Sequence, residues 1–332
     1  MTDSTYDVVG IGNAIVDIIA RCDDEFLAAQ ELAKGHMQLV DQTAASALYD
    51  AIGPAVEISG GSAANTIAGI ASFGGKAAYI GKVSDDELGR IFAHDIKASG
   101  VSFDTKPAQS STPTARSIVL VTPDAERTMS TYLGISPELD SSDVDPELIK
   151  NSKILYLEGY LFDAPQAMEA FRFAAQIAKQ AGREVSITLS DGFCVDRHRD
   201  AFLSFIKADI DILFANEAEI LSLYQTESLE TAIENAAADA KIAAITRSEK
   251  GSVIVSGSGR HEINAENVAS VADTTGAGDL FAAGFLSGQA KGMSLEQSAK
   301  LGHIAAAEII SHIGARPEAS LRDLAISDGV PL

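Results

Sequence analysis

The sequence predicts a three-layer α/β protein, with a mostly parallel sheet covered by helices on both faces and a small β-sheet lid beside it. Short apolar runs alternate with helical segments along most of the chain, and repeated strand–helix–strand units build parallel sheets. Two stretches, 15–22 and 115–132, are β-rich without a helix between their strands. At 332 residues, with 46% hydrophobic and 22% charged residues, the chain is globular and long enough for a large core.

The other expected elements follow in chain order. Residues 6–12 and 37–40 are short apolar runs, and after Gly60-Gly61 apolar residues recur at helical spacing until Gly74-Gly75. The remaining expected elements are a strand at 77–81, a helix at 87–99, a strand at 154–157, a helix at 164–181, strands at 184–189 and 210–214, a helix at 229–238, a strand at 242–246, and two Ala-rich helices within 276–313.

The lid is predicted from the two stretches that break this rhythm. Residues 15–22 give one strand, and 115–132 give two strands around the turn at Pro123-Asp124. We interpret them as a small antiparallel sheet. The lid is therefore expected from about residues 13–40 and 106–133, inserted in a single domain that spans residues 1–332.

Charge and cysteine content narrow the possible partners. The chain carries 25 Lys and Arg against 47 Asp and Glu, a formal net charge of −22, which disfavours nucleic acid and anionic membranes. An anionic substrate would therefore need backbone dipoles to hold it. Cys22 and Cys194 lie far apart without metal-ligand spacing, which favours a reducing, cytoplasmic location. No apolar stretch reaches 18 residues, so no membrane span is expected.

The segment Asp273-Thr-Thr-Gly-Ala-Gly-Asp279 is the most informative motif. Its glycines precede an apolar helix, so the backbone N–H groups of Gly276, Ala277 and Gly278 are expected to form an anion-binding hole. A carboxylate beside bound anions needs a separate role, and Asp279 is suited to accept a proton from a hydroxyl that attacks a phosphoryl group. The alternative is an ordinary helix cap.

A second group of residues is suited to a polyhydroxylated ligand. Gly60 and Gly61 permit close approach to the backbone, and Asn65 lies one turn into the following helix. Asn13 and Asp17 flank the start of the strand that enters the lid, where sugar hydroxyls would satisfy them. A plain glycine turn and solvated strand ends are the alternatives.

The Asn216-Glu-Ala-Glu219 segment follows a buried strand, at the sheet edge where α/β proteins bind ligands. Asn216 and Glu219 could orient water bound to magnesium near phosphates. The alternative is a simple helix start.

Together, Gly60-Gly61 with Asn65, Asn216-x-x-Glu219 and the 273–279 motif resemble the ribokinase-like (PfkB) carbohydrate kinase family in order and spacing. Within that family the chain looks most like adenosine kinases, through the stretches 12–17, 211–217 and 302–306. The resemblance implies a ribokinase-like fold and transfer of the γ-phosphoryl group of ATP to the 5′-hydroxyl of a nucleoside, adenosine to AMP, with Mg²⁺ and, in many members, a monovalent cation such as K⁺.

The resemblance also implies roles for single residues. Asp279 would be the base, Gly276, Ala277 and Gly278 the anion hole, and Glu219 a metal-water ligand. The substrate would contact Asn13, Asp17, Gly60, Gly61, Asn65 and Tyr160, and the nucleotide Arg127, Asn216, Thr246, Ser248, Gly251 and His303. At position 248 this chain has serine where the family usually has glycine. The alternative for His303 is a place in the core.

The acceptor substrate stays open at this point. Tyr160, Leu161 and Phe162 lie where adenosine kinases carry aromatic residues that stack on the purine. Inosine, guanosine, or a free sugar such as ribose or fructose remain alternatives, as do a monomer and a homodimer.

Overall fold

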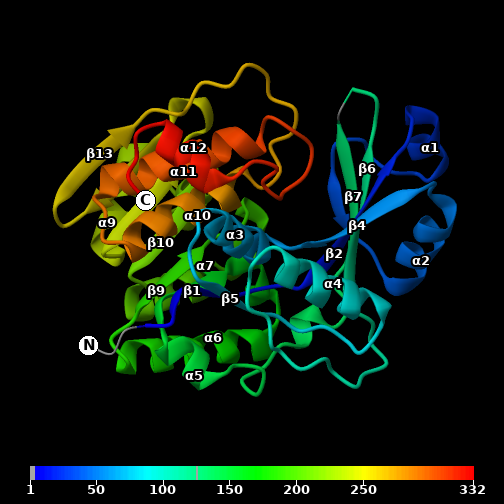
Figure 1. The fold of residues 1–332 in the computed structure, drawn as a ribbon, viewed down its shortest axis with the longest axis horizontal. Helices are drawn as coiled ribbons and strands as arrows, with labels where there is room; N and C mark the ends of the chain where they lie inside the picture. Colours follow the sequence, from blue (N-terminus) through cyan, green and yellow to red (C-terminus); the bar gives the residue numbers. More distant parts are fainter. Residues whose placement is uncertain (1–3, 125) are drawn as a thin grey trace.

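The computed structural model describes residues 4–124 and 126–332, which fold into two sheets of unequal size (Figure 1). The larger sheet has eight strands in the order β13-β12-β11-β10-β9-β8-β1-β5, and the smaller has five in the order β3-β7-β6-β2-β4. The smaller sheet projects from the larger with α1 and α2 on its outer side. The predicted three-layer fold with a mostly parallel sheet and a lid is confirmed.

The eight-stranded sheet is parallel from β5 through β1, β8, β9 and β10 to β11, and antiparallel from β11 to β13. Its strands are β1 (Tyr6–Ile11), β5 (Ala77–Ile80), β8 (Ser152–Glu158), β9 (Glu184–Thr188), β10 (Ile212–Asn216), β11 (Ile242–Thr246), β12 (Ser252–Ser256) and β13 (Gly259–Ile263). The sequence analysis did not predict the β12–β13 hairpin. Its outer strand carries mostly polar, exposed residues, so the apolar signal is absent there.

Successive residues of the central strands face two separate cores. In β1, Val8 belongs to the core beneath one helical layer and Val9 to the core beneath the other, as the two-residue period of a strand requires. One layer contains α3 (Ser62–Ser72), α4 (Glu87–Ala98), α10 (Ala277–Ala290), α11 (Leu295–Ile309) and α12 (Leu321–Ser327). The other contains α5 (Pro146–Lys150), α6 (Pro165–Gln180), α7 (Gly192–Asp209), α8 (Glu217–Leu223) and α9 (Leu229–Asp239). Both faces of the sheet are therefore covered.

The five-stranded lid differs from the expected antiparallel sheet. β2 pairs in parallel with β6, and β3 in parallel with β7, while β2–β4 and β6–β7 are antiparallel. β2 and β6 both enter the lid from the main domain and so run in the same direction, which corrects the purely antiparallel expectation. The lid elements are β2 (Ile15–Arg21), α1 (Asp24–Ala29), β3 (Met37–Leu39), α2 (Gln42–Ala51), β4 (Ala55–Gly60), β6 (Ala115–Val121) and β7 (Arg127–Tyr132).

Short connections join the lid to the main domain. Only three residues, 12–14, separate β1 from β2, and only Gly61 separates β4 from α3. After β7 the chain returns through the 3₁₀ turn Ser136–Glu138, and two further 3₁₀ turns are Gly159–Asp163 and Ser248–Lys250. Among the described residues, no helix combines the length and apolar character needed to cross a bilayer.

Candidate active site

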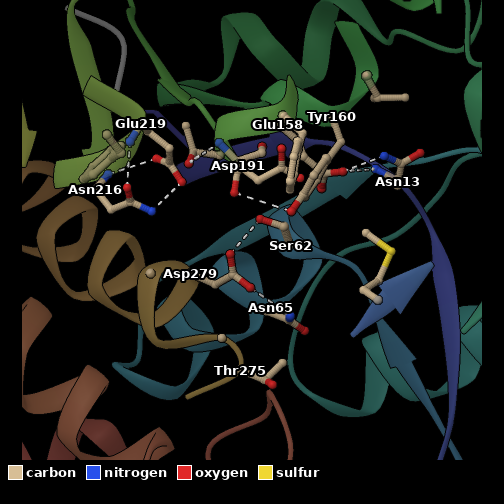
Figure 2. Close-up of a pocket in the computed structure, with 18 of the residues that line it drawn as sticks. Asn13, Ser62, Asn65, Glu158, Tyr160, Asp191, Asn216, Glu219, Thr275 and Asp279 are labelled. Atoms are coloured by element: carbon tan, nitrogen blue, oxygen red, sulfur yellow. Dashed lines mark hydrogen bonds between the residues drawn. The ribbon is translucent and has the colours of Figure 1, made fainter. Parts of the chain in front are cut away.

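A cavity of about 610 Å³ lies where the lid meets the ends of the main-sheet strands. The last residues of β8, β9, β10 and β11 all line it, namely Glu158, Thr188, Asn216 and Thr246. In open α/β sheets ligands bind at the carboxyl ends of the strands. Figure 2 shows Asp279 in the centre of the site, with Asn216 and Glu219 on one side and Asn13 on the other.

Asp279 is held by two donors from the start of helix α3. Ser62 Oγ donates to Asp279 Oδ1 at 2.6 Å, and Asn65 Nδ2 donates to Oδ2 at 3.0 Å (Figure 2). Because the amide nitrogen of Asn65 faces the carboxylate, its Oδ1 is left buried without a hydrogen-bond partner among the described residues. Since Asn65 lines the cavity, this orphaned acceptor is available to a hydroxyl of a bound molecule.

The electrostatics of Asp279 suit a proton acceptor. Burial raises the pKa of its carboxyl above the ordinary value, while the hydrogen bonds from Ser62 and Asn65 and the Arg316 guanidinium oppose that rise. Arg316 is held in place by backbone acceptors, with Nη2 donating to Ser59 O at 2.8 Å. A carboxylate with a raised pKa is a stronger base than a fully solvated one.

The motif 273–279 forms the turn into helix α10, as predicted. Gly276 is the N-cap in the left-handed conformation, with φ 78°. The N–H of Ala277 donates to Thr274 O at 3.2 Å, whereas the N–H groups of Gly276 and Gly278 have no partner within the described part of the chain. These two groups, with the positive end of the α10 dipole, favour an anion beside Asp279.

Asn13 lies at the corner between β1 and β2, and both ends of its side-chain amide form hydrogen bonds within the protein. Its Nδ2 donates to Glu158 Oε1 at 2.6 Å, and its Oδ1 accepts from Ser136 Oγ at 2.9 Å. Burial raises the pKa of the Glu158 carboxyl to about 7, against hydrogen bonds from Ala63 and Asn13. Sequence reasoning missed Glu158, although a carboxylate that ends an apolar strand is a recognisable signal.

Asn216 and Glu219 form a capping box at the start of α8. Asn216 Oδ1 accepts from the Glu219 N–H at 2.8 Å, and Glu219 accepts from the Asn216 backbone N–H at 2.9 Å and from its Nδ2 at 2.7 Å. Burial raises the pKa of Glu219 to about 7. Both carboxylate oxygens of Glu219 accept a hydrogen bond from Asn216. Within residues 4–124 and 126–332, no cluster of three His, Cys, Asp or Glu side chains could hold a metal ion.

The loop after β11 contains the remaining nucleotide-binding candidates. Thr246 lines the cavity, while Ser248 and Gly251 lie just beyond it. Ser248 has φ 52°, in the left-handed region that favours glycine, which explains the glycine expected there. His303 is buried in the core: its Nε2 lies 2.9 Å from Ser252 Oγ, its ring packs on Phe281, and burial lowers its pKa to about 4.

Two charged candidates lie outside the cavity wall. Arg127 of β7 is buried and forms an ion pair with Asp273, which links the lid to the 273–279 motif. Asp17 of β2 is half-buried against Gly60, and burial raises its pKa to about 6 despite the nearby Arg127 and Arg316.

Gly61 is required by its backbone. Its φ is 99°, and an added Cβ would lie 2.3 Å from Asn13 O. The turn therefore brings the start of α3 against the β1–β2 corner.

The structure brings most of the predicted residues to one cavity, but not all. Those that line it are Asn13, Asn65, Tyr160, Asn216, Glu219, Thr246, Gly276, Ala277, Gly278 and Asp279. Those that do not are Asp17, Gly60, Gly61, Arg127, Ser248, Gly251 and His303. Residues that sequence reasoning missed are Ser62, Glu158, Phe193 and Arg316.

The aromatic lining differs from the expected one. Phe162 stacks on Phe202 in the core, with ring centroids 4.0 Å apart, whereas Tyr160 and Leu161 line the cavity. Phe193, which is 76% exposed, is a further aromatic side chain of the wall, together with the buried Phe214 and Phe281. The 3₁₀ turn at Gly159–Asp163 directs Phe162 inward, and the apolar pattern of 160–162 gave no sign of that turn.

Comparison with known proteins agrees with this arrangement. Residues 51–321 match the model of the pfkB family carbohydrate kinases. The crystal structure of adenosine kinase from Sinorhizobium meliloti is 54% identical, with a TM-score of 0.91, and covers 98% of this chain and 100% of that one. A probable sugar kinase from Rhizobium etli is 52% identical, with a TM-score of 0.92, and covers 99% of this chain and 100% of that one.

A plant protein is a more distant relative. A probable chloroplastic fructokinase-6 from Arabidopsis thaliana is 32% identical over 249 residues, which span 72% of this chain and 64% of that protein. Members of the matched family transfer phosphoryl groups from ATP to alcohol groups. The family match over most of the chain, the two-sheet fold and the Asp279 site agree: this chain belongs to the pfkB family of carbohydrate kinases and is an adenosine kinase-like phosphotransferase.

Proposed function

We propose that this protein transfers the γ-phosphoryl group of ATP to the 5′-hydroxyl of adenosine. The observation that carries the choice of a nucleoside is the apolar part of the cavity wall. Met37, Leu39 and Met129 of the lid line the same cavity as Phe193 of α7, and Phe193 and Leu39 are 76% and 59% exposed. A purine base would bury these side chains, whereas a free sugar presents hydroxyl groups on every side.

In this mechanism the chain positions one proton acceptor and one anion site. Asp279 accepts the proton of the 5′-hydroxyl as that oxygen attacks the γ-phosphorus of ATP, while the bond from that phosphorus to the β–γ bridging oxygen breaks and ADP leaves. Ser62 and Asn65 fix the direction of the carboxylate. The free N–H groups of Gly276 and Gly278 stabilise charge on the transferred group. The acceptor Oδ1 of Asn65 is available to a ribose hydroxyl.

Glu219 and Asn216 fit a magnesium ion bound through water, since both line the cavity and Glu219 is anionic above a pH of about 7. When bound with ATP, magnesium would neutralise phosphate charge. No contact among residues 4–124 and 126–332 identifies a potassium site.

A sugar kinase is the second candidate, because the chain is 52% identical to a probable sugar kinase. A panel of adenosine, inosine, guanosine, ribose and fructose, assayed with ATP in the presence and absence of Mg²⁺ and K⁺, separates the two. We expect adenosine to have the highest kcat/KM. A higher kcat/KM for fructose or ribose would overturn the nucleoside assignment.

Phe193→Ala tests the base-binding wall directly. We expect its KM for adenosine to rise about tenfold or more, because the aromatic ring that the bound purine would cover is lost. We expect its KM for ATP to stay unchanged. Phe173→Ala is the matched control, because Phe173 is 37% exposed on α6 and does not line the cavity. Equal effects of the two substitutions would contradict the proposed wall.

A further inference from the structure

Glu158 is a buried carboxylate at the place where the lid connections meet the main domain. It is 1% exposed. Its Oε1 accepts from Asn13 Nδ2 at 2.6 Å and from the Asn13 N–H at 3.2 Å, and its Oε2 accepts from the Ala63 N–H at 2.8 Å. One carboxylate therefore joins the β1–β2 connection to the first turn of α3, which follows the β4–α3 connection.

A third connection is attached through Asn13. Ser136 Oγ, in the turn after β7, donates to Asn13 Oδ1 at 2.9 Å and accepts from the Ala14 N–H at 3.0 Å. Tyr79 OH also donates to Asn13 O at 2.8 Å. The chain segments 12–14, 61–63 and 133–136, each of which links the lid to the main domain, are thus held in one hydrogen-bonded network around Glu158.

The same turn of α3 holds Asp279. Ser62 and Asn65, which donate to the two Asp279 oxygens, flank Ala63 in the sequence. Movement of this turn away from β8 would shift both donors together. The position of the Asp279 carboxylate therefore depends on the contact between Ala63 and Glu158, although Glu158 itself makes no hydrogen bond to Asp279 (Figure 2).

We propose that Glu158 is a positioning residue, which holds the lid connections and the first turn of α3 in the geometry that Asp279 and the acceptor substrate require. This role rests on one part of the proposed function, namely that Asp279 is the base. Only an ionised carboxylate satisfies the site, because all its partners are donors. Its negative charge also complements the N-terminal dipole of the 11-residue helix α3.

The first test is Glu158→Gln, assayed for both substrates. Glutamine places an NH₂ group against either Asn13 or Ala63, so one donor loses its acceptor. We expect KM for the acceptor substrate to rise at least tenfold and kcat to fall, while KM for ATP stays within twofold. A merely structural role would lower thermal stability without this split between the two KM values.

Asp211→Asn is the matched control. Asp211 is also 1% exposed and accepts from Val185 N–H at 2.8 Å and Lys179 Nζ at 2.7 Å, but it precedes the amino end of β10, whereas the cavity lies at the carboxyl ends of the strands, and it does not line the cavity. We expect this variant to lose stability with both KM values unchanged. Unchanged acceptor KM and kcat in Glu158→Gln, alongside a comparable loss of stability, would overturn the proposal.

Amide hydrogen exchange provides a readout that needs no activity. We expect the segments 12–16 and 61–66 to exchange faster in Glu158→Gln than in the wild-type protein, and not in Asp211→Asn. Unchanged exchange in both segments would overturn the proposal. If the wild-type enzyme phosphorylates none of the tested acceptors, the proposed function fails, and the exchange measurement still decides the role of Glu158.

Gly12→Ala gives a second variant in case Glu158→Gln does not fold. A Cβ at Gly12 would lie 2.5 Å from Glu158 Oε2 and 2.6 Å from the Ala63 Cβ, so it would push the carboxylate away from Ala63 without removing its charge. We expect the same selective rise in acceptor KM and the same local increase in exchange. Wild-type values for both would overturn the proposal.

Discussion

The two ends of the cavity are built in different ways. We define the Asp279 end by Asn13, Ser62, Asn65, Glu158 and Asp279, and the Glu219 end by Asn216, Glu219 and Thr246, with the adjoining loop that contains Ser248. At the Asp279 end the decisive hydrogen bonds join residues 217, 214 and 145 positions apart in the sequence. At the Glu219 end the capping box joins residues only three positions apart.

This difference predicts how far a substitution acts. A change at the Asp279 end disturbs contacts between the lid connection, α3 and α10. Asn13 lies in that connection, α3 supplies Ser62 and Asn65, and α10 supplies Asp279. A change at the Glu219 end alters one helix start and its adjacent loop. We therefore expect the first group to affect the acceptor substrate and catalysis, and the second to affect ATP binding or stability alone.

The largest effect is expected for Asp279→Asn. An amide cannot accept the hydroxyl proton, so kcat should fall by roughly 10³-fold or more, within the range for loss of a general base. Transfer of labelled phosphate from ATP measures kcat, and titration calorimetry with ATP checks that the nucleotide still binds. A kcat within tenfold of the wild-type value would show that Asp279 is not the base. It would also contradict the expectation that the Asp279 end controls catalysis.

Ser62→Ala tests the contribution of one hydrogen bond at the Asp279 end. The hydrogen bond from Ser62 lowers the pKa of Asp279, so its loss should move the acidic limb of the kcat/KM profile to higher pH. We expect kcat at neutral pH to fall roughly tenfold, as loss of one charge-assisted hydrogen bond implies. Ser72→Ala is the control, since Ser72 Oγ accepts from Leu321 N–H at the other end of α3. A shift of the same size in both variants would contradict the assignment.

Glu219→Gln tests the Glu219 end through pH-dependent stability. Because the folded-state pKa of Glu219 is raised from 4.5 to about 7, the folded protein binds the proton more tightly than the unfolded chain. The stability from this group is therefore present at low pH and declines as pH rises from about 4.5 to 7. Relative to the variant, the wild-type protein should lose about 2–3 kcal/mol of unfolding free energy between pH 5 and pH 8.

Urea denaturation at several pH values measures this difference. A difference that does not change with pH would contradict the raised pKa. An increased acceptor KM in Glu219→Gln would instead break the comparison between the two ends.

The smallest effect is expected for Ser248→Gly. A φ of 52° costs less conformational free energy in glycine than in serine. The free energy of unfolding should therefore rise by about 0.5–1 kcal/mol, with acceptor KM unchanged. Gln225→Gly is the control, because Gln225 also has a positive φ, 48°, but lies in a different loop, after α8. Thermal denaturation of both variants should show similar gains. A loss of stability in Ser248→Gly alone would show that the serine side chain has a separate role.

The sequence predicted the parts of this site that depend on local pattern. The 273–279 motif and Asn216-x-x-Glu219 can be recognised because their residues act within one turn of each other. The departure at Ser248 is visible for the same reason. The parallel strands of the main sheet were predicted equally well, because strands such as β8 and β10 contain runs of four apolar residues, whereas the buried antiparallel strand β12 was missed.

Long-range pairing and exposed strands could not be predicted in this way. Nothing in the spacing of Ser62 and Asp279 indicates their contact, and Glu158 gains its partners only when β1, β8 and α3 assemble. β4 escaped prediction because its Val56 is 62% exposed in the lid, so its apolar residues do not mark one buried face. Phe162 was expected in the cavity wall but lies in the core, and Phe193 of the wall was not predicted, since tertiary packing decides which ring is covered.

The three-residue connection between β1 and β2 limits how this chain can change its length. Side chains of a strand alternate between its two faces, so one inserted residue after Ile11 would turn every β2 side chain over relative to the rest of the lid. Asp17 would then exchange places with Val16 or Ile18, both fully buried. We therefore expect insertions to be tolerated at the Pro123-Asp124 turn, at the far tip of the lid, and rejected between residues 11 and 15.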